Sequence, residues 1–197
     1  MKKILQKNEK ILRLTAREVP FRQIKTAKIK KILEEMKESL KSQDDGVAIA
    51  APQIGYSLRI FLVSGRMMKT GFSARSLGEN YQSGEVKVNA IGDAEGASAK
   101  QDPEVVDMVF INPKISKLSK AKEWMPEGCL SVRPLYGKTF RSNKATVVAY
   151  DENGKKFTRG ASGILAQIFQ HETDHLNGIL FIDHAKDISE EIPKKKN

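Results

Sequence analysis

The sequence QHETDHLNG, at residues 170–178, closes a helical pattern and determines how the rest of the chain is interpreted. His171 and His175 are four residues apart, so on a helix both imidazoles project from one face and can bind the same metal ion. Glu172 follows the first histidine and can act as general base on a water at that metal. Because two of the three histidines in the chain lie here, metal-assisted hydrolysis is the leading hypothesis.

The helix that carries this motif is expected to begin at Ser162 as its N-cap and to stop at Gly178. Its predicted apolar stripe is Ile164, Leu165, Ile168, Phe169 and Leu176, and its polar face is Gln167, Gln170, Thr173, Asp174 and Asn177. His171, Glu172 and His175 fall on the apolar stripe. Buried ionisable groups need strong partners, and a metal ion would supply one.

The length and composition indicate one soluble domain that spans residues 1–197. No run approaches the roughly 18 apolar residues of a membrane span, so no membrane partner is expected. Residues 1–7 are too charged for a secretory signal, which predicts a cytoplasmic protein, or an organellar one if a leader has been removed. The single cysteine, Cys129, rules out an intramolecular disulfide.

The net charge of +10 would suit an anionic partner. The lysines are spread along the chain, however, with small clusters at residues 28–31 and 194–196 and no ribonucleoprotein signature. A solvated basic surface is therefore the favoured interpretation.

Other elements follow from hydrophobic periodicity. Residues 26–43 predict a helix that ends at Asp44-Asp45-Gly46, and residues 59–64 and 108–112 predict strands. Residues 144–150 and 155–159 predict a hairpin, with Asn153-Gly154 as a tight two-residue turn. Residues 65–106 are rich in glycine and lack periodicity, which predicts a loop insertion.

A catalytic zinc-type site needs a third protein ligand. Proteases with the His-Glu-x-x-His pattern place it downstream, but the position that the metzincin pattern reserves for histidine is Phe181. His184 comes three residues too late, and Glu190 and Glu191 lie in a polar tail. Cys129 is the other candidate.

Three motifs together are specific. EGCLSV at residues 127–132 and QHETDHLNG at residues 170–178 resemble the second and third signatures of peptide deformylases. GVAIAAPQIG at residues 46–55 resembles the first, except that Ala48 replaces the second glycine. The resemblance implies the α+β peptide deformylase fold, with antiparallel sheets packed around a central metal-binding helix. It also implies removal of the formyl group from N-formylmethionyl nascent polypeptides, with release of formate.

The resemblance also implies roles for individual residues. Cys129, His171 and His175 would bind one divalent metal, natively Fe(II), with Zn(II), Ni(II) or Co(II) able to replace it. The catalytic set would be Glu172 as general base, and the Gln53 amide and the Leu130 N–H as oxyanion donors. Substrate-binding positions would be Gly46, Ala48 and Gly128, where the methyl of Ala48 narrows the site or shifts the backbone.

Glu127 and Arg141 are expected to form an ion pair, which either supports the ligands or is an ordinary surface pair. Asp174 is expected to face away from the metal in a structural role.

Two other functional classes remain open. The first is a zinc endopeptidase that uses the same helix, for which Cys129 would be dispensable. The second is a non-catalytic relative that binds nascent chains or ribosomes. Lys194–Lys196 could in addition contact ribosomal RNA near the nascent-chain exit, an interaction that would weaken with salt.

Overall fold

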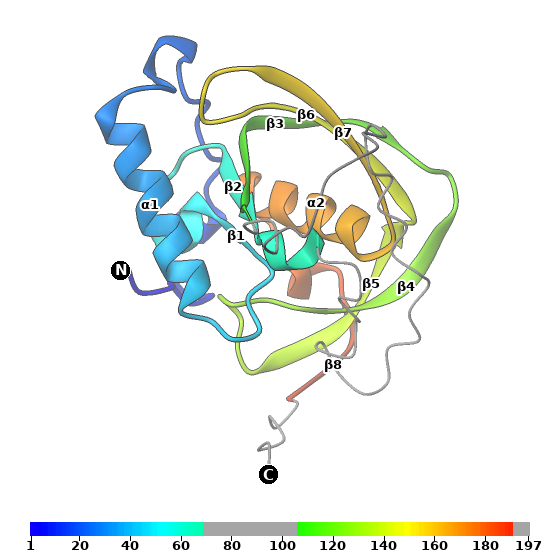
Figure 1. Cartoon of the computed structure of the whole chain (residues 1–197). Coiled ribbons are helices and arrows are strands. Elements are labelled where there is room, and N and C mark those ends of the chain that lie inside the picture. The colour runs from blue at the N-terminus through cyan, green and yellow to red at the C-terminus, as the bar shows by residue number, and fades with distance from the viewer. Residues whose placement is uncertain (69–105, 191–197) are drawn as a thin grey trace, which may run out of the picture.

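The computed structural model describes residues 1–68 and 106–190 of the chain. Helix α2 (Gly163–Leu176) lies centrally and packs against strands of two antiparallel sheets (Figure 1). The five-stranded sheet has the order β1 (Ala48–Ala50), β2 (Ile60–Val63), β3 (Met108–Leu118), β6 (Lys144–Tyr150), β7 (Lys156–Ser162). The three-stranded sheet has the order β4 (Lys122–Gly128), β5 (Leu135–Ser142), β8 (Lys186–Glu190). The predicted α+β class and the central helix are confirmed.

The remaining helical elements are short, apart from α1. They are α1 (Ala27–Lys41) and the 3₁₀ helices η1 (Lys10–Arg13), η2 (Phe21–Gln23), η3 (Ala51–Ile54), η4 (Gly65–Met68) and η6 (Phe181–Asp183). Within the described ranges, no helix is long and apolar enough to cross a membrane.

Helix α1 matches its prediction closely. Thr26 is its N-cap and its hydroxyl accepts a hydrogen bond from the Ile29 N–H, at 3.5 Å. The side chains at helical spacing are buried, namely Ile29, Ile32, Leu33, Met36 and Leu40. The helix ends at Ser42, and residues 43–46 then turn the chain into β1.

Strand β2 shows how the sheet separates the two helices. All four of its residues are buried, which is typical of a strand covered on both faces. Phe61 and Val63 belong to the apolar cluster that includes α2, whereas Ile60 and Leu62 belong to the cluster that includes α1. Because strand side chains alternate, α1 and α2 cover opposite faces of the five-stranded sheet.

The β6–β7 hairpin is confirmed, but its predicted two-residue turn is wrong. The N–H of Asp151 donates to the Lys155 carbonyl at 3.0 Å, so the loop has three residues. Only Gly154 has a positive φ, of 75°, which is the pattern of a turn followed by a left-handed residue. The Asp151 carboxylate accepts hydrogen bonds from the N–H groups of Asn153 and Lys155 and so favours the longer loop.

The predicted limits of α2 are confirmed. Ser162 occupies the N-cap position, although its side chain makes no capping hydrogen bond. Gly178 follows the helix with a φ of 75°. A Cβ at Gly178 would lie 2.7 Å from the carbonyl carbon and oxygen of Arg13, so this position requires glycine for both its dihedral and its packing.

Most of the predicted polar face of α2 does not face water, although Asn177 at its end is exposed. Gln167, Gln170 and Thr173 are all buried, and each has an internal partner. Gln170 accepts from the N–H of Ser142 and donates to its carbonyl, while Gln167 donates to the carbonyl of Pro126. The polar residues of α2 therefore attach the helix to the strands around it.

The predicted insertion at residues 65–106 is only partly within the described residues. Gly65–Met68 forms η4, and residues 69–105 lie outside the described ranges. Lys194–Lys196 also lie outside them.

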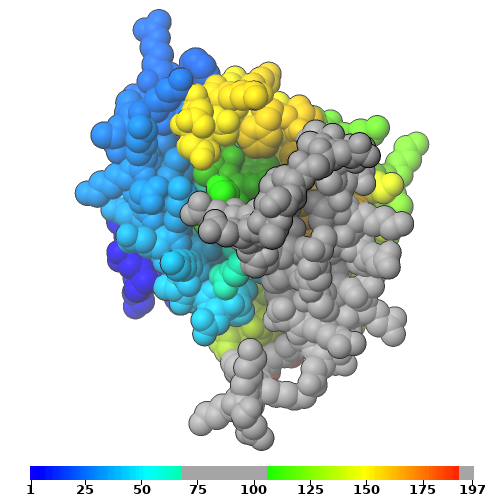
Figure 2. All heavy atoms as spheres, in the orientation of Figure 1, coloured from blue at the N-terminus to red at the C-terminus, as the bar shows by residue number. Residues whose placement is uncertain are grey.

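On the visible face, the η2–α1 region and the β6–β7 hairpin adjoin (Figure 2), and the ring centroids of Phe21 and Tyr150 are 5.5 Å apart.

Candidate metal centre

Three potential metal ligands converge between the sheets. Cys129 directly follows β4, and His171 and His175 project from α2. Their ligand atoms all lie within 4.8 Å of one another, and Cys129 Sγ is 3.1 Å from His175 Nε2. A thiolate and two imidazoles at this spacing fit one divalent transition metal and leave room for a water.

The alternative third ligands lie elsewhere. Phe181 is buried in an apolar cluster with Leu12 and Leu180. His184 and Glu190 are exposed. Among the residues that the structure describes, Cys129 is the group that completes a three-ligand site with the two histidines.

Glu127 holds His171 in position. Its Oε1 is 2.7 Å from His171 Nδ1, which leaves Nε2 of that ring to face a metal. The other donors to the Glu127 carboxylate are Thr139 Oγ1 at 2.6 Å, Arg141 Nε at 3.0 Å, Arg141 Nη2 at 2.7 Å and Gln167 Nε2 at 3.1 Å. Burial alone would raise the pKa of Glu127, but His171 and Arg141 outweigh it and hold that pKa well below its ordinary value.

The Glu127–Arg141 pair predicted from sequence is present, and it is not a surface pair. The two side chains are 4% and 8% exposed. Arg141 also donates to Asp174 Oδ2 at 2.6 Å, so Asp174 balances the second half of the guanidinium charge. Asp174 therefore has the structural role expected of it, and a chain of charged groups runs from α2 through Arg141 and Glu127 to His171.

Glu172 is buried without a hydrogen-bond partner for Oε2 among the described residues. Burial raises the pKa of Glu172 to about 7, the Glu127 charge adds to this rise and His171 opposes it. His175 Nδ1 likewise has no described partner. Burial also lowers the pKa of His175 well below its ordinary value, which keeps its imidazole neutral, the form that binds a metal. An unpartnered buried carboxylate beside three ligands indicates a site built to receive further groups.

Gln53 connects the first motif to Cys129. It lies in η3, where its Oε1 accepts a hydrogen bond from the Ala50 N–H at 2.8 Å. Its Nε2 donates to Ser131 Oγ at 3.0 Å and lies 3.6 Å from Cys129 Sγ. The structure thus places Gln53 at the metal centre, with its amide orientation fixed by Ala50 and Ser131.

Ser131 is a residue that the sequence reasoning missed. Its N–H donates to Cys129 Sγ at 3.4 Å, and its hydroxyl holds the Gln53 amide. The spacing Cys-x-Ser was a usable signal, because an N–H two residues after a thiolate can reach back to the sulfur. Leu130, between them, is half-buried, and its carbonyl accepts from Gln6 Nε2 at 3.2 Å.

The three positions proposed to bind substrate differ in their local surroundings. A Cβ at Gly46 would lie 3.0 Å from Leu40 and Gln43, and one at Gly128 would lie 2.6 Å from the Tyr136 ring. Both glycines therefore permit close packing around the site. Ala48 lies in β1 opposite Val63 and has no positive φ, so its backbone is unstrained. Its methyl is buried in the apolar cluster that includes α2.

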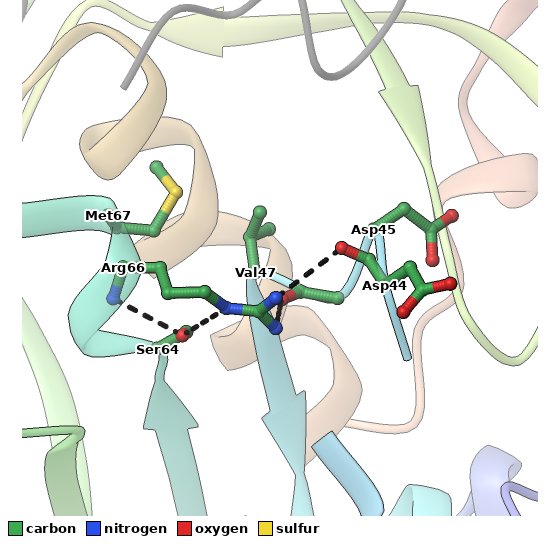
Figure 3. A pocket seen from close by; sticks show the side chains of 7 residues that line it. Asp44, Asp45, Val47, Ser64, Arg66 and Met67 are labelled. Atoms are coloured by element: carbon green, nitrogen blue, oxygen red, sulfur yellow. Dashed lines mark hydrogen bonds between the residues drawn. The ribbon is translucent and has the colours of Figure 1, made fainter. Parts of the chain in front are cut away.

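A separate pocket of about 80 Å³ lies beside the turn that carries Gly46 (Figure 3). It is lined by Asp44, Asp45, Gly46, Val47, Ser64, Arg66 and Met67, and by none of the three ligands. The Arg66 guanidinium donates to the carbonyl oxygens of Gln43 and Gly46 at 3.3 and 3.2 Å. Arg133 forms an ion pair with Asp45 on the other side of the turn. The side chains around this pocket therefore hold the turn at Gly46, where the first motif begins.

Comparisons with known proteins agree with this geometry. The family model for polypeptide deformylase matches residues 1–191. Peptide deformylase 2 of Clostridium acetobutylicum is 33% identical over 183 residues, which cover 93% of this chain and 94% of the relative. Peptide deformylase of Halothermothrix orenii is 34% identical over 167 residues, which cover 85% of this chain and 84% of the relative.

Solved structures give the same result. A peptide deformylase from Synechococcus elongatus in complex with actinonin matches with a TM-score of 0.69 and 27% identity, over 94% of this chain and 79% of that one. The Met-Ala-Ser-bound class I type b enzyme from Acinetobacter baumannii has a TM-score of 0.69 and 27% identity, over 93% of this chain and 99% of that one. The chain therefore belongs to the polypeptide deformylase family, and it is a hydrolase that removes the N-terminal formyl group from nascent polypeptides.

Proposed function

We propose that Cys129, His171 and His175 bind one divalent metal and that Glu172 transfers the protons of the deformylation reaction. The observation that carries this proposal is the convergence of the three ligand atoms within 4.8 Å, next to a buried carboxylate oxygen that has no described partner. We propose Fe(II) as the native metal, with Zn(II), Ni(II) or Co(II) as substitutes that the same donors accept. When bound, the metal would polarise the formyl carbonyl and lower the pKa of a water in the site.

Glu172 is suited to the proton transfers. A pKa of about 7 allows its carboxylate to accept a proton and later to deliver it to the leaving amine near neutral pH. Glu127 and Arg141 neither accept nor donate that proton, because their charges are committed to each other. Glu127 orients His171 through Nδ1, and Arg141 holds Glu127 in place.

Attack on the formyl carbon places negative charge on the formyl oxygen, and this oxyanion needs hydrogen-bond donors. We assign this role to the Gln53 side-chain amide and the Leu130 backbone N–H. Gln53 is already held by Ala50 and Ser131, so it requires little reorganisation during the reaction. The loss of one such donor typically raises the barrier by about 3–4 kcal/mol.

We propose that N-formylmethionyl peptides bind along the segments that contain Gly46, Ala48 and Gly128. In the described sheets β1 and β4 are edge strands, and a free strand edge can accept an extended peptide. We further propose a cytoplasmic location near the ribosome surface, since nascent chains are the substrates of the family. The buried methyl of Ala48 supports the view that this substitution leaves the reaction itself unchanged.

A formate-release assay with formyl-Met-Ala-Ser on anaerobically purified protein tests the proposal. Glu172→Ala should retain stoichiometric metal by elemental analysis yet show no turnover. Cys129→Ser should lose both metal and activity, whereas Glu123→Ala, an exposed change in the same strand as Glu127, should retain both. A Cys129→Ser protein that keeps its metal would contradict the ligand set, and an active Glu172→Ala protein would contradict the proton-transfer role.

A further inference from the structure

The outer face of the three-stranded sheet carries two exposed aromatic side chains. Trp124 in β4 and Phe140 in β5 are directly opposite each other, and their ring centroids are 5.3 Å apart. They are 44% and 50% exposed. Their strand neighbours Met125 and Thr139 point to the other face and are buried. The sheet thus presents an aromatic pair to solvent, where antiparallel sheets normally place polar residues.

Two lysines lie close to this aromatic pair. Lys186 Nζ lies 4.7 Å from the centroid of the Trp124 ring, and Lys122 Nζ lies 6.0 Å from that of Phe140. Neither lysine forms an ion pair within the described part of the chain, whereas Lys138 is paired with Asp187 at 3.1 Å.

The surrounding sequence is also basic. Residues 108–150 contain eight Lys and Arg but only two acidic residues, Glu123 and Glu127. Glu127 is buried against Arg141, so Glu123 is the only acidic side chain of this range that can face water. Within the three-stranded sheet the charges balance, because β8 adds Asp187 and Glu190, and Asp187 is paired with Lys138. The positive charge next to the aromatic pair is therefore that of Lys122 and Lys186.

We infer that this face binds single-stranded RNA, with Trp124 and Phe140 stacking on bases and Lys122 and Lys186 neutralising phosphates. Every base has a π face, and exposed aromatic side chains on a flat sheet flanked by basic groups are a general means of holding unpaired bases. A second copy of this chain fits poorly, because the lysines of the two faces would repel each other. An anionic membrane fits less well than RNA, because the rings lie on a strand surface rather than on a protruding loop or helix.

The RNA face and the metal centre can act at the same time. Trp124 and Glu127 belong to the same strand but point to opposite faces of the sheet. RNA bound over Trp124 would leave Glu127, His171 and Cys129 untouched on the inner side. The inference is therefore independent of the proposed metal chemistry.

Trp124 provides a direct signal, because it is the only tryptophan in the chain. Titration with a 12-nucleotide oligouridylate at low salt should quench its fluorescence saturably, as stacking predicts. Phe140→Ala should weaken binding by about tenfold, measured by anisotropy of the fluorescein-labelled oligonucleotide. Trp124→Phe should bind better than Trp124→Ala, because the smaller ring still stacks.

The charge contribution is tested by salt dependence. Replacing both Lys122 and Lys186 with alanine should reduce the slope of log affinity against log salt by about 1.4. The matched control replaces Lys28 and Lys31, which lie exposed on α1, and should leave the affinity within about twofold. Phe21→Ala is the aromatic control, since Phe21 is 64% exposed but lies outside this sheet. All variants should release formate at the wild-type rate, which verifies their folding.

Three outcomes would overturn the inference. One is absence of Trp124 quenching at saturating oligonucleotide. Another is an equal loss of affinity in the Lys28 and Lys31 control, which would indicate a diffuse charge effect. The third is binding to phosphatidylglycerol vesicles that depends on Trp124 and Phe140 while RNA binding does not, which would assign the face to a lipid surface.

Discussion

Gly178 illustrates how a single residue determines where α2 ends. Its φ of 75° is costly for a residue with a side chain, and its missing Cβ makes room for the backbone of Arg13. Gly178→Ala should destabilise the protein by at least about 1–3 kcal/mol, measured by urea unfolding. Gly160→Ala is the control, because a Cβ there would meet nothing closer than 3.9 Å and no positive φ is involved. Equal stability of the two variants would contradict this role for Gly178.

Glu127 is the residue on which His171 and Arg141 both depend. Glu127→Gln removes the negative charge that balances a buried guanidinium, so unfolding free energy should fall by about 3–5 kcal/mol. The metal affinity should fall by about 10- to 100-fold, because His171 loses its charged acceptor. Chelator competition measures the second effect, and Glu123→Gln in the same strand is the control. Unchanged affinity would mean that Glu127 does not orient His171.

Many residues of the metal centre could be predicted from the sequence, each for a different physical reason. The spacing of His171 and His175 needs only helical geometry, and the resemblance supplied Cys129 and Gln53. The contact between Ser131 and Gln53 depends on two segments that meet only in the folded chain. The burial of Glu127 and Arg141 was not predictable either, because charged residues in alternating strands usually face water.

Among the elements, α2 depends on its polar side chains as much as on its apolar ones. Gln170 bonds both the N–H and the carbonyl of Ser142, which is itself buried. Gln170→Leu would leave both groups unpartnered, at a cost of about 1–3 kcal/mol each, measurable by chemical unfolding. Gln23→Leu, at an exposed position, should change stability by less than about 0.5 kcal/mol. A stable Gln170→Leu protein would show that water replaces the lost partners.

The existence of the helices and of the β6–β7 hairpin followed from periodicity, but their local details did not. The Asn153-Gly154 pair favours a two-residue turn when considered alone. The Asp151 carboxylate lies just before it and binds two N–H groups of the longer loop. The residues of the polar face of α2 were predicted correctly, but the three-stranded sheet covers Gln167 and Gln170. Helical spacing carries no information about that sheet.

The stability of the whole molecule should depend on the metal. A metal present at about 100 times its dissociation constant stabilises the folded state by about 2.7 kcal/mol. For a chain of this size, chelation should therefore lower the melting temperature by roughly 5–10 °C in a calorimetric scan. Cys129→Ser is the control, since its melting temperature should not respond to the chelator. A wild-type midpoint that is unaffected by verified metal removal would exclude this coupling.

The arrangement of the two sheets was beyond prediction from the residues alone. Strand β3 pairs with β6, so β4 and β5 leave the first sheet and form another with β8. Alternation in a strand shows which side chains are buried but does not identify the neighbouring strand. The resemblance to a known family was therefore needed to expect antiparallel sheets on both sides of a central helix.

The residues of the metal centre lie far apart along the chain, and this affects when the centre can form during folding. Gln53 and Cys129 are 76 residues apart, and Cys129 and His175 are 46 residues apart. Contacts across such separations close late, because large loops must be ordered before they form. During refolding, the Cys-His-His geometry can therefore exist only after η3, the end of β4 and α2 have docked. The uptake of a coloured ion such as Co(II) should thus follow the last folding phase and mark the arrival of the native state.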